Sequence, residues 1–171
     1  MYRRGHIDNA VEFFIEGIKL SPDDKQLYYA FAEIFLHAKN HKDAIDILKE
    51  MPQDEKDIKR LELLGYCKEG MGNNKEAQGY ADRILSINDH FAPALNLKGI
   101  LAFKQGDISF AEDCFNKAIE SDAGYGEPYT NLGAILWDSQ PKEALDLFEK
   151  GFILSPKITD IITNYHVGYL W

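Results

Sequence analysis

The segment LKGILAFKQGDISFAEDCFNKAIESD, residues 97–122, decides the fold of this chain. Apolar residues recur every three or four positions on both sides of a Gly-Asp turn, which predicts two amphipathic helices joined as a hairpin. Small residues interrupt the apolar faces of both helices, at Gly99, Ala102, Ala111 and Ala118. Because small side chains let packed helices approach closely, we expect these positions to mark helix crossings in a core.

The pattern of this hairpin recurs along the whole chain at a nearly constant interval. Gly99 has counterparts at Gly65 and Gly133, 34 residues away on either side. The alanine of the second helix recurs five times, at Ala10, Ala44, Ala77, Ala111 and Ala144. One such hairpin cannot bury its apolar face alone, so we expect successive hairpins to stack into a solenoid.

Further positions keep the same register in the two most regular units. In residues 92–125 they are Leu95, Gly99, Ala102, Ala111, Phe115 and Ala118; in residues 126–158 they are Tyr129, Leu132, Gly133, Leu136, Ala144, Phe148, Gly151 and Pro156. This combination resembles the signature of the tetratricopeptide repeat (TPR) family, whose unit is a helix-turn-helix of about 34 residues. The resemblance implies an all-α fold, a right-handed α-solenoid superhelix of TPR hairpins.

The repeat register divides residues 1–171 into the units of a single array. We expect full repeats at 25–57, 58–91, 92–125 and 126–158, the second helix of a partial repeat at 6–20, and the first helix of a partial repeat at 159–171. Val11, Phe14 and Ile18 are expected to be exposed on the first of these end helices. Since each end helix lacks a partner, the chain is expected to be a fragment of a longer protein, and its complementary ends predict end-to-end self-association through 6–20 and 159–171.

Charge and composition exclude several classes of partner. The formal net charge is -9, which argues against nucleic acid because phosphate binding requires clustered Lys and Arg. No apolar run approaches the roughly 20 residues that cross a bilayer, so no membrane insertion is expected. Cys67 and Cys114 fall inside helical patterns, which favours small core residues in a reducing compartment and a cytoplasmic location.

The sequence carries no pattern of residues that predicts catalysis. His37 and His41 are four residues apart, but a turn separates them and no third metal ligand is near. The stretch GMGNN at 70–74 is a hairpin turn that follows no strand, so it does not predict a phosphate-binding loop. We therefore expect no enzyme activity, no metal and no cofactor.

In the TPR family the first helices of successive repeats line a concave groove that binds peptides or helices. Transferred repeat by repeat, this resemblance implies the following groove residues: Tyr29, Glu33, Glu62, Tyr66, Asn96, Ile100, Phe103, Lys104, Asn131, Trp137 and Asn164. Aromatic anchors within a polar rim favour a protein or peptide partner with apolar side chains and some basic residues. The alternative for each aromatic ring is packing between adjacent repeats.

Two known uses of the groove are less favoured. A carboxylate clamp for acidic chaperone tails requires Lys and Asn where this chain has Tyr29 and Glu33. Asn131 and Asn164 fit an asparagine ladder, but Ala30, Leu63 and Leu97 hold the corresponding place in earlier repeats. The leading interpretation is a non-catalytic protein–protein interaction scaffold. The alternatives are a TPR module of a larger bacterial multidomain enzyme, such as a glycosyltransferase, and a self-assembling TPR scaffold.

Overall fold

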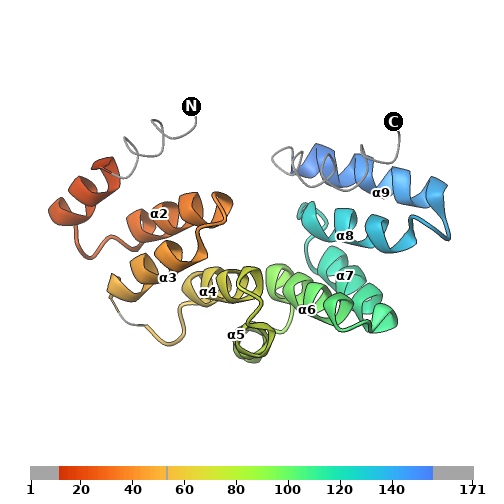
Figure 1. The fold of residues 1–171 in the computed structure, drawn as a ribbon, viewed down its shortest axis with the longest axis horizontal. Helices are drawn as coiled ribbons and strands as arrows, with labels where there is room; N and C mark the ends of the chain where they lie inside the picture. Colours follow the sequence, from red (N-terminus) through yellow and green to blue (C-terminus); the bar gives the residue numbers. More distant parts are fainter. Residues whose placement is uncertain (1–11, 53, 156–171) are drawn as a thin grey trace. The chain divides into compact units, whose positions relative to one another are not determined.

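The computed structural model describes residues 12–52 and 54–155, and every regular element within them is a helix. The helices are α2 (Lys25–His37), α3 (His41–Glu50), α4 (Ile58–Gly70), α5 (Asn74–Ile87), α6 (Ala92–Lys104), α7 (Ile108–Ser121), α8 (Glu127–Leu136) and α9 (Pro141–Leu154) (Figure 1). Residues 12–20 are also helical. The predicted all-α fold of helical repeats is confirmed.

Consecutive helices pair as hairpins, and the hairpins form two compact units, residues 1–87 and 88–171. In the first unit α2 pairs with α3 and α4 with α5, and α4 also packs against α2 and α3. In the second unit α6 pairs with α7 and α8 with α9, and α8 also packs against α6 and α7. Each unit therefore contains two stacked hairpins whose first helices lie side by side.

The glycines of the repeat register make room for aromatic rings of the second helix. A Cβ on Gly99 would lie 2.5 Å from the ring of Phe115, and a Cβ on Gly133 would lie 3.0 Å from the ring of Phe148. Phe115 is only 2% exposed, so its ring has little space to move away. The small residues predicted at helix crossings are thus needed for the second helix to reach the first.

Three hairpin turns share one hydrogen-bond pattern. The backbone N–H groups of Asn40, Asn73 and Asp107 donate to carbonyl groups five residues earlier, and the N–H of each preceding residue donates to the carbonyl three residues earlier. This is the Schellman motif, which holds one residue in the left-handed region. That residue is Gly72 (φ 78°) or Gly106 (φ 83°) in two of the turns but Lys39 (φ 58°) in the third.

Replacing Lys39 with glycine is expected to raise the free energy of unfolding by roughly 0.5–1 kcal/mol. A side chain at positive φ crowds the following carbonyl, and glycine removes this strain. Lys39→Ala is the matched control, because it removes the same charged side chain but keeps the Cβ. Urea denaturation measures both variants; equal stability of Lys39→Gly and Lys39→Ala would contradict the prediction.

The fourth hairpin turns differently from the others: four residues separate α8 from α9, whereas three residues separate the helices of each other hairpin, so the shorter turn expected from the sequence is not found. Helix α8 has 10 residues, whereas α2, α4 and α6 have 13 each. The N–H of Gln140 donates to the carbonyl of Leu136 at 2.7 Å, and Pro141 begins the next helix. The early end of α8 leaves Trp137 in the turn rather than within a helix.

The helical residues 12–20 pack against α2. The ring of Phe14 stacks on Phe31 at a centroid distance of 5.3 Å, and Ile18 packs against the core of the first unit. The prediction that Phe14 and Ile18 are exposed is therefore wrong. The large apolar side chains exposed among residues 12–20 are those of Phe13, Ile15 and Leu20. Val11 and residues 159–171 lie outside the described residues.

Candidate functional site

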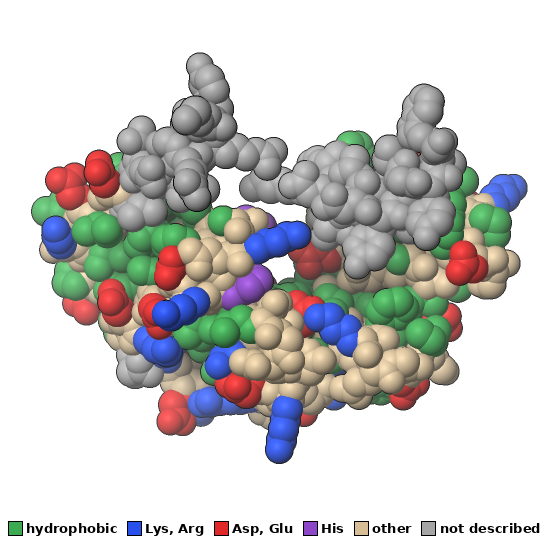
Figure 2. Space-filling view, viewed as in Figure 1, with side chains coloured by type: hydrophobic (Ala, Val, Ile, Leu, Met, Phe, Trp, Pro, Cys, Tyr) green, Lys and Arg blue, Asp and Glu red, His purple; other side chains and the backbone are tan. Residues whose placement is uncertain are grey.

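The described residues of the predicted groove lie on the first helices of both units, except Trp137, which directly follows α8. We call those of the first unit the α2–α4 face (Tyr29, Glu33, Glu62, Tyr66) and those of the second unit the α6–α8 face (Asn96, Ile100, Phe103, Lys104, Asn131, Trp137). Asn164 lies outside the described residues. Acidic and basic side chains are interspersed over the surface visible in Figure 2 rather than gathered into one charged patch.

A lysine bridges the two acidic side chains of the α2–α4 face. The Nζ atom of Lys59 lies 2.9 Å from a carboxylate oxygen of Glu33 and 3.5 Å from one of Glu62. Burial alone would lower the pKa of Lys59, but the carboxylates of Glu62 and Glu33 outweigh burial and raise it. The predicted acidic character of this face is therefore partly offset by a residue of the same face.

The groove assignment predicted an exposed ring at Tyr29. The structure shows instead that Tyr29 packs between repeats. Its side chain is 7% exposed, and its hydroxyl donates to the carboxylate of Asp57, with oxygen–oxygen distances of 2.5 and 2.6 Å. Asp57 also accepts hydrogen bonds from the Nζ of Lys25 at 2.9 Å and the backbone N–H of Arg60 at 3.0 Å. This polar cluster ties α2 to the first turn of α4.

The ionisation of Asp57 is set by two opposing effects. Burial disfavours its charged form, but the hydrogen bonds from Tyr29, Lys25 and the Arg60 N–H together hold the pKa of the carboxyl below its usual value. Burial and the hydrogen bond to the Asp57 carboxylate raise the pKa of the Tyr29 hydroxyl. The pair is therefore a phenol and a carboxylate at neutral pH. Asp57 is not among the residues that the sequence predicted for this site. The sequence marks it only as an acidic residue directly before a predicted helix.

On the α6–α8 face a buried asparagine holds a half-buried one. Asn96, placed in the groove by prediction, is 0% exposed, and its Oδ1 accepts a hydrogen bond from the Nδ2 of Asn131 at 2.9 Å. The Nδ2 of Asn96 lies 3.4 Å from both the Tyr125 hydroxyl and a Glu127 carboxylate oxygen. Asn96 is thus a supporting residue, and it fixes the orientation of the half-buried Asn131 carboxamide.

The aromatic side chains of the predicted groove differ in what they offer a ligand. Phe103 is 48% exposed, whereas Tyr66 and Trp137 are half-buried. The ring of Trp137 packs against Phe148 of its own hairpin at a centroid distance of 5.9 Å. Ile100 packs against the core of its unit. Phe103 is therefore the predicted aromatic anchor with the most surface free for a partner.

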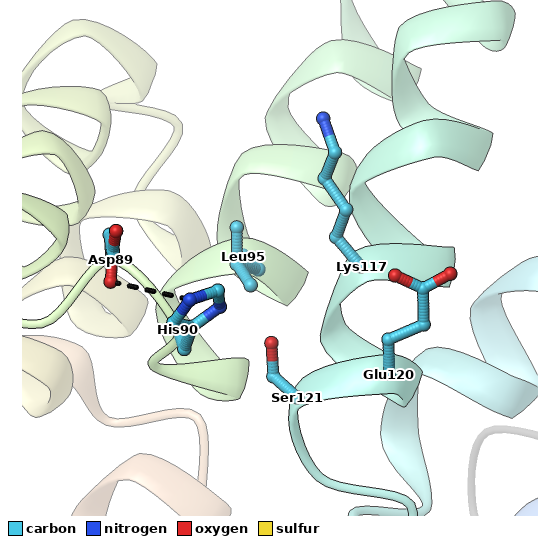
Figure 3. Close-up of a pocket in the computed structure, with 6 residues that line it drawn as sticks. All are labelled: Asp89, His90, Leu95, Lys117, Glu120 and Ser121. Atoms are coloured by element: carbon cyan, nitrogen blue, oxygen red, sulfur yellow. Dashed lines mark ion pairs between the residues drawn. The ribbon is translucent and has the colours of Figure 1, made fainter.

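A shallow pocket of about 440 Å³ opens in the second unit, between the loop that precedes α6 and the end of α7 (Figure 3). Its lining residues are Asp89, His90, Leu95, Lys117, Glu120 and Ser121. The Nε2 of His90 lies 3.7 Å from Asp89, but both side chains are more than four-fifths exposed, at 81% and 84%. Water competes for such exposed groups, so this ion pair would contribute little to the binding of a ligand in the pocket.

The described residues offer little for metal or thiol chemistry. No three His, Cys, Asp or Glu side chains among them are grouped so as to hold a metal ion. Cys67 and Cys114 are free and buried, and burial raises the pKa of the Cys67 thiol to about 11. A thiol with that pKa stays protonated at neutral pH and is a poor nucleophile. None of the described helices is long and apolar enough to cross a membrane.

Comparison with solved structures places this fold among TPR proteins. The chain superposes on TTC0263, a thermophilic TPR protein of Thermus thermophilus, with a TM-score of 0.74 and 19% identity, covering 99% of this chain and 94% of the other. It also superposes on a crystal structure of the APC/C hetero-tetramer Cut9–Hcn1, with a TM-score of 0.76 and 20% identity over 97% of this chain and 34% of the other. The peptide-binding TPR protein YrrB gives a TM-score of 0.51 and 19% identity over 89% and 79%.

Sequence comparison gives the family directly. No curated protein is similar enough in sequence to count as a relative. Two family models of the tetratricopeptide repeat match, one over residues 1–64 and one over residues 92–125. The second range coincides with the repeat that contains the helix crossing at Gly99. Together with the stacked hairpins, these matches show that the chain belongs to the tetratricopeptide repeat family.

Proposed function

We propose that this chain is a non-catalytic scaffold that binds a peptide or a partner protein on its first-helix faces. Two of the similar structures support this class of function: YrrB is described as having an unusual peptide-binding site, and Cut9 is part of a protein complex with Hcn1. Fold similarity at this level of identity supports a function by analogy. Further support for a binding function comes from the side chains of the α6–α8 face.

The observation that carries the proposal is that the α6–α8 face contains both the exposed ring of Phe103 and the oriented carboxamide of Asn131. Phe103 lies seven residues after Asn96, so both are on the same side of α6, and Asn96 holds Asn131 at 2.9 Å. An exposed ring and an oriented carboxamide on one face supply an apolar anchor and a directed hydrogen-bonding group. Protein-binding surfaces combine these two elements.

The proposed partner is a segment with an apolar anchor rather than a strongly basic one. Lys59 already pairs with Glu33 and Glu62, which reduces the attraction of the α2–α4 face for basic side chains. A cytoplasmic location belongs to the same proposal, supported by two free and buried cysteines. End-to-end self-association stays a prediction.

Selection of random peptides displayed on phage against the purified chain tests the proposal. We expect the selected peptides to bind Phe103→Ala roughly tenfold more weakly than the parent, a loss of about 1.4 kcal/mol, as measured by fluorescence anisotropy. Asn131→Ala is expected to weaken binding less, because one hydrogen bond to a half-buried amide contributes little net free energy.

Phe110 provides a matched control, because it is 43% exposed but lies on α7, a second helix. Phe110→Ala is expected to leave peptide binding unchanged. Peptides that are sensitive to Phe110→Ala but not to Phe103→Ala would place the binding surface on the second helices. Failure to enrich any peptide would contradict the proposal.

A further inference from the structure

Four hydrogen-bonded side chains lead from the loop before α8 to the α6–α8 face. We call them the α6–α8 polar cluster: Tyr125, Glu127, Asn96 and Asn131. Glu127 is the first residue of α8 and Asn131 lies four residues later, so both are on the same side of that helix. Asn96 of α6 is buried and contacts both of them. The cluster therefore connects a carboxylate with the half-buried carboxamide of Asn131 through one buried residue.

The donors and acceptors of the cluster favour one orientation of each carboxamide. The Tyr125 hydroxyl donates its hydrogen to the Glu127 carboxylate, so both groups can only accept a hydrogen bond from Asn96. The Nδ2 of Asn96 faces them at 3.4 Å, and its Oδ1 is thereby turned toward Asn131. The Nδ2 of Asn131 donates to that oxygen at 2.9 Å. The carboxylate of Glu127 thus determines which end of the Asn131 carboxamide faces Asn96.

The carboxamide oxygen of Asn131 remains available to a partner. Among residues 12–52 and 54–155, the buried side-chain oxygens without a hydrogen-bond partner belong to Asn74 and Thr130. The Oδ1 of Asn131 is not one of them and accepts no hydrogen bond from a described residue, so it faces solvent. A carboxamide oxygen accepts hydrogen bonds and cannot donate them. The α6–α8 face therefore presents an acceptor at this position.

The packing between repeats does not require this polar cluster. The register place of Asn131 is held by Leu63 in α4 and by Leu97 in α6, which are 3% and 0% exposed. An apolar side chain can thus serve at that place, whereas a buried polar group such as the Asn96 carboxamide destabilises the fold unless its hydrogen bonds are made. A cluster that stacking does not need favours a role in recognition.

We propose that Glu127 is a positioning residue, which acts through Asn96 so that Asn131 presents its carboxamide oxygen to the partner. The partner segment accordingly carries an N–H donor opposite Asn131, in addition to the apolar side chain that contacts Phe103. This inference rests on the proposed function of the α6–α8 face and specifies the chemistry of its partner. Glu127 itself does not contact the partner.

Nuclear magnetic resonance of the full chain, labelled with heavy nitrogen, tests the orientation without a ligand. We expect the side-chain N–H groups of Asn131 to exchange with water about threefold more slowly than those of the exposed Asn116. In Glu127→Ala the freed Tyr125 hydroxyl can donate to Asn96, whose carboxamide can then turn over, so this protection is expected to be lost. Tyr125→Phe is the matched control, because it leaves the carboxylate in place, and it should retain the protection.

Peptide binding tests the same effect at the partner. The probe is a peptide selected on phage against the parent chain, and fluorescence anisotropy measures its dissociation constant. We expect Glu127→Ala and Asn131→Ala each to raise this constant roughly threefold, and the double variant to raise it no further, because both changes remove the same hydrogen bond. N-methylation and alanine substitution along the peptide should identify one N–H donor whose removal weakens binding to the parent but not to Asn131→Ala.

The two measurements separate this inference from the proposed function. Equal exchange of Asn131 and Asn116 in the parent, or protection that survives Glu127→Ala, would overturn the positioning role of Glu127. Additive losses in the double variant would also overturn it, because they would assign Glu127 a contact of its own with the peptide. A selected peptide without such a donor would overturn the stated chemistry of the partner. If no peptide binds, the proposed function fails, and the exchange measurement alone decides the orientation of Asn131. Unchanged protection of the α7 backbone amides establishes that each variant remains folded.

Discussion

Gly151→Ala is expected to lower the free energy of unfolding by roughly 2 kcal/mol. A Cβ at this position would lie 2.4 Å from the Oγ1 of Thr130, 3.0 Å from the carbonyl oxygen of Gly126 and 3.2 Å from the backbone nitrogen of Thr130. Two of these atoms belong to the backbone, and Thr130 is 4% exposed and β-branched, so its side chain has few other rotamers. Overpacking of this kind costs about 1–3 kcal/mol or more, and the helix propensity of alanine offsets about 1 kcal/mol.

The control for this prediction is another helical glycine, Gly79. It lies in the middle of α5, and a Cβ there would meet nothing within 4 Å. Gly79→Ala is therefore expected to raise the free energy of unfolding by roughly 0.5–1 kcal/mol through helix propensity alone. Urea denaturation of both variants measures the two effects. A Gly151→Ala variant as stable as the parent would show that α8 and α9 cross at a greater distance than in this structure.

The positions of the helix crossings were predictable because a small residue recurs at the same register place in several repeats. Gly99 and Gly133 share a register place, and the alanines of the second helices share another, so each is supported by its counterparts. The partner of each small residue was harder to predict. That Phe115 lies over Gly99 and Thr130 beside Gly151 depends on the rotation of one helix against another, which periodicity does not determine.

The candidate site was less predictable than the fold, for the same reason. The register assigned Tyr29, Asn96 and Phe103 to the same side of the first helices, yet the first two are buried and the third is exposed. Each buried one has a polar partner on the next first helix, Asp57 for Tyr29 and Asn131 for Asn96. A sequence pattern places a residue on a face of a helix, but a contact with the neighbouring helix decides whether the residue remains available to a ligand.

Asp57→Ala is expected to lower the free energy of unfolding of the chain by roughly 2–4 kcal/mol at pH 7. The substitution removes the N-cap of α4, which contributes about 1 kcal/mol, and leaves the buried hydroxyl of Tyr29 without its acceptor. The side chain of Asp57 is 6% exposed, so solvent cannot readily replace the lost carboxylate. Asp57→Asn should cost less, because the carboxamide oxygen still accepts from Tyr29 or from the Arg60 N–H.

The pH dependence separates the charge of Asp57 from its hydrogen bonds. The folded-state pKa of this carboxyl lies below the usual value of 3.8, so its ionised form stabilises the fold at pH values above 3.8. This contribution is lost as the pH falls through the folded-state pKa. The stability difference between the parent and Asp57→Asn should therefore be constant near neutral pH and shrink below about pH 4. Urea denaturation at a series of pH values measures it.

Asp54 is the matched control for the charge, because it pairs with the same lysine. The Nζ of Lys25 lies 3.1 Å from Asp54, whose side chain is 49% exposed, and 2.9 Å from Asp57. Asp54→Asn is expected to change stability little, since an exposed ion pair contributes little to stability. If Asp54→Asn and Asp57→Asn have equal effects, the stabilisation comes from the charge of Lys25 and its surroundings. An effect confined to Asp57 assigns it to the buried contact with Tyr29, which holds the first helices of two repeats together.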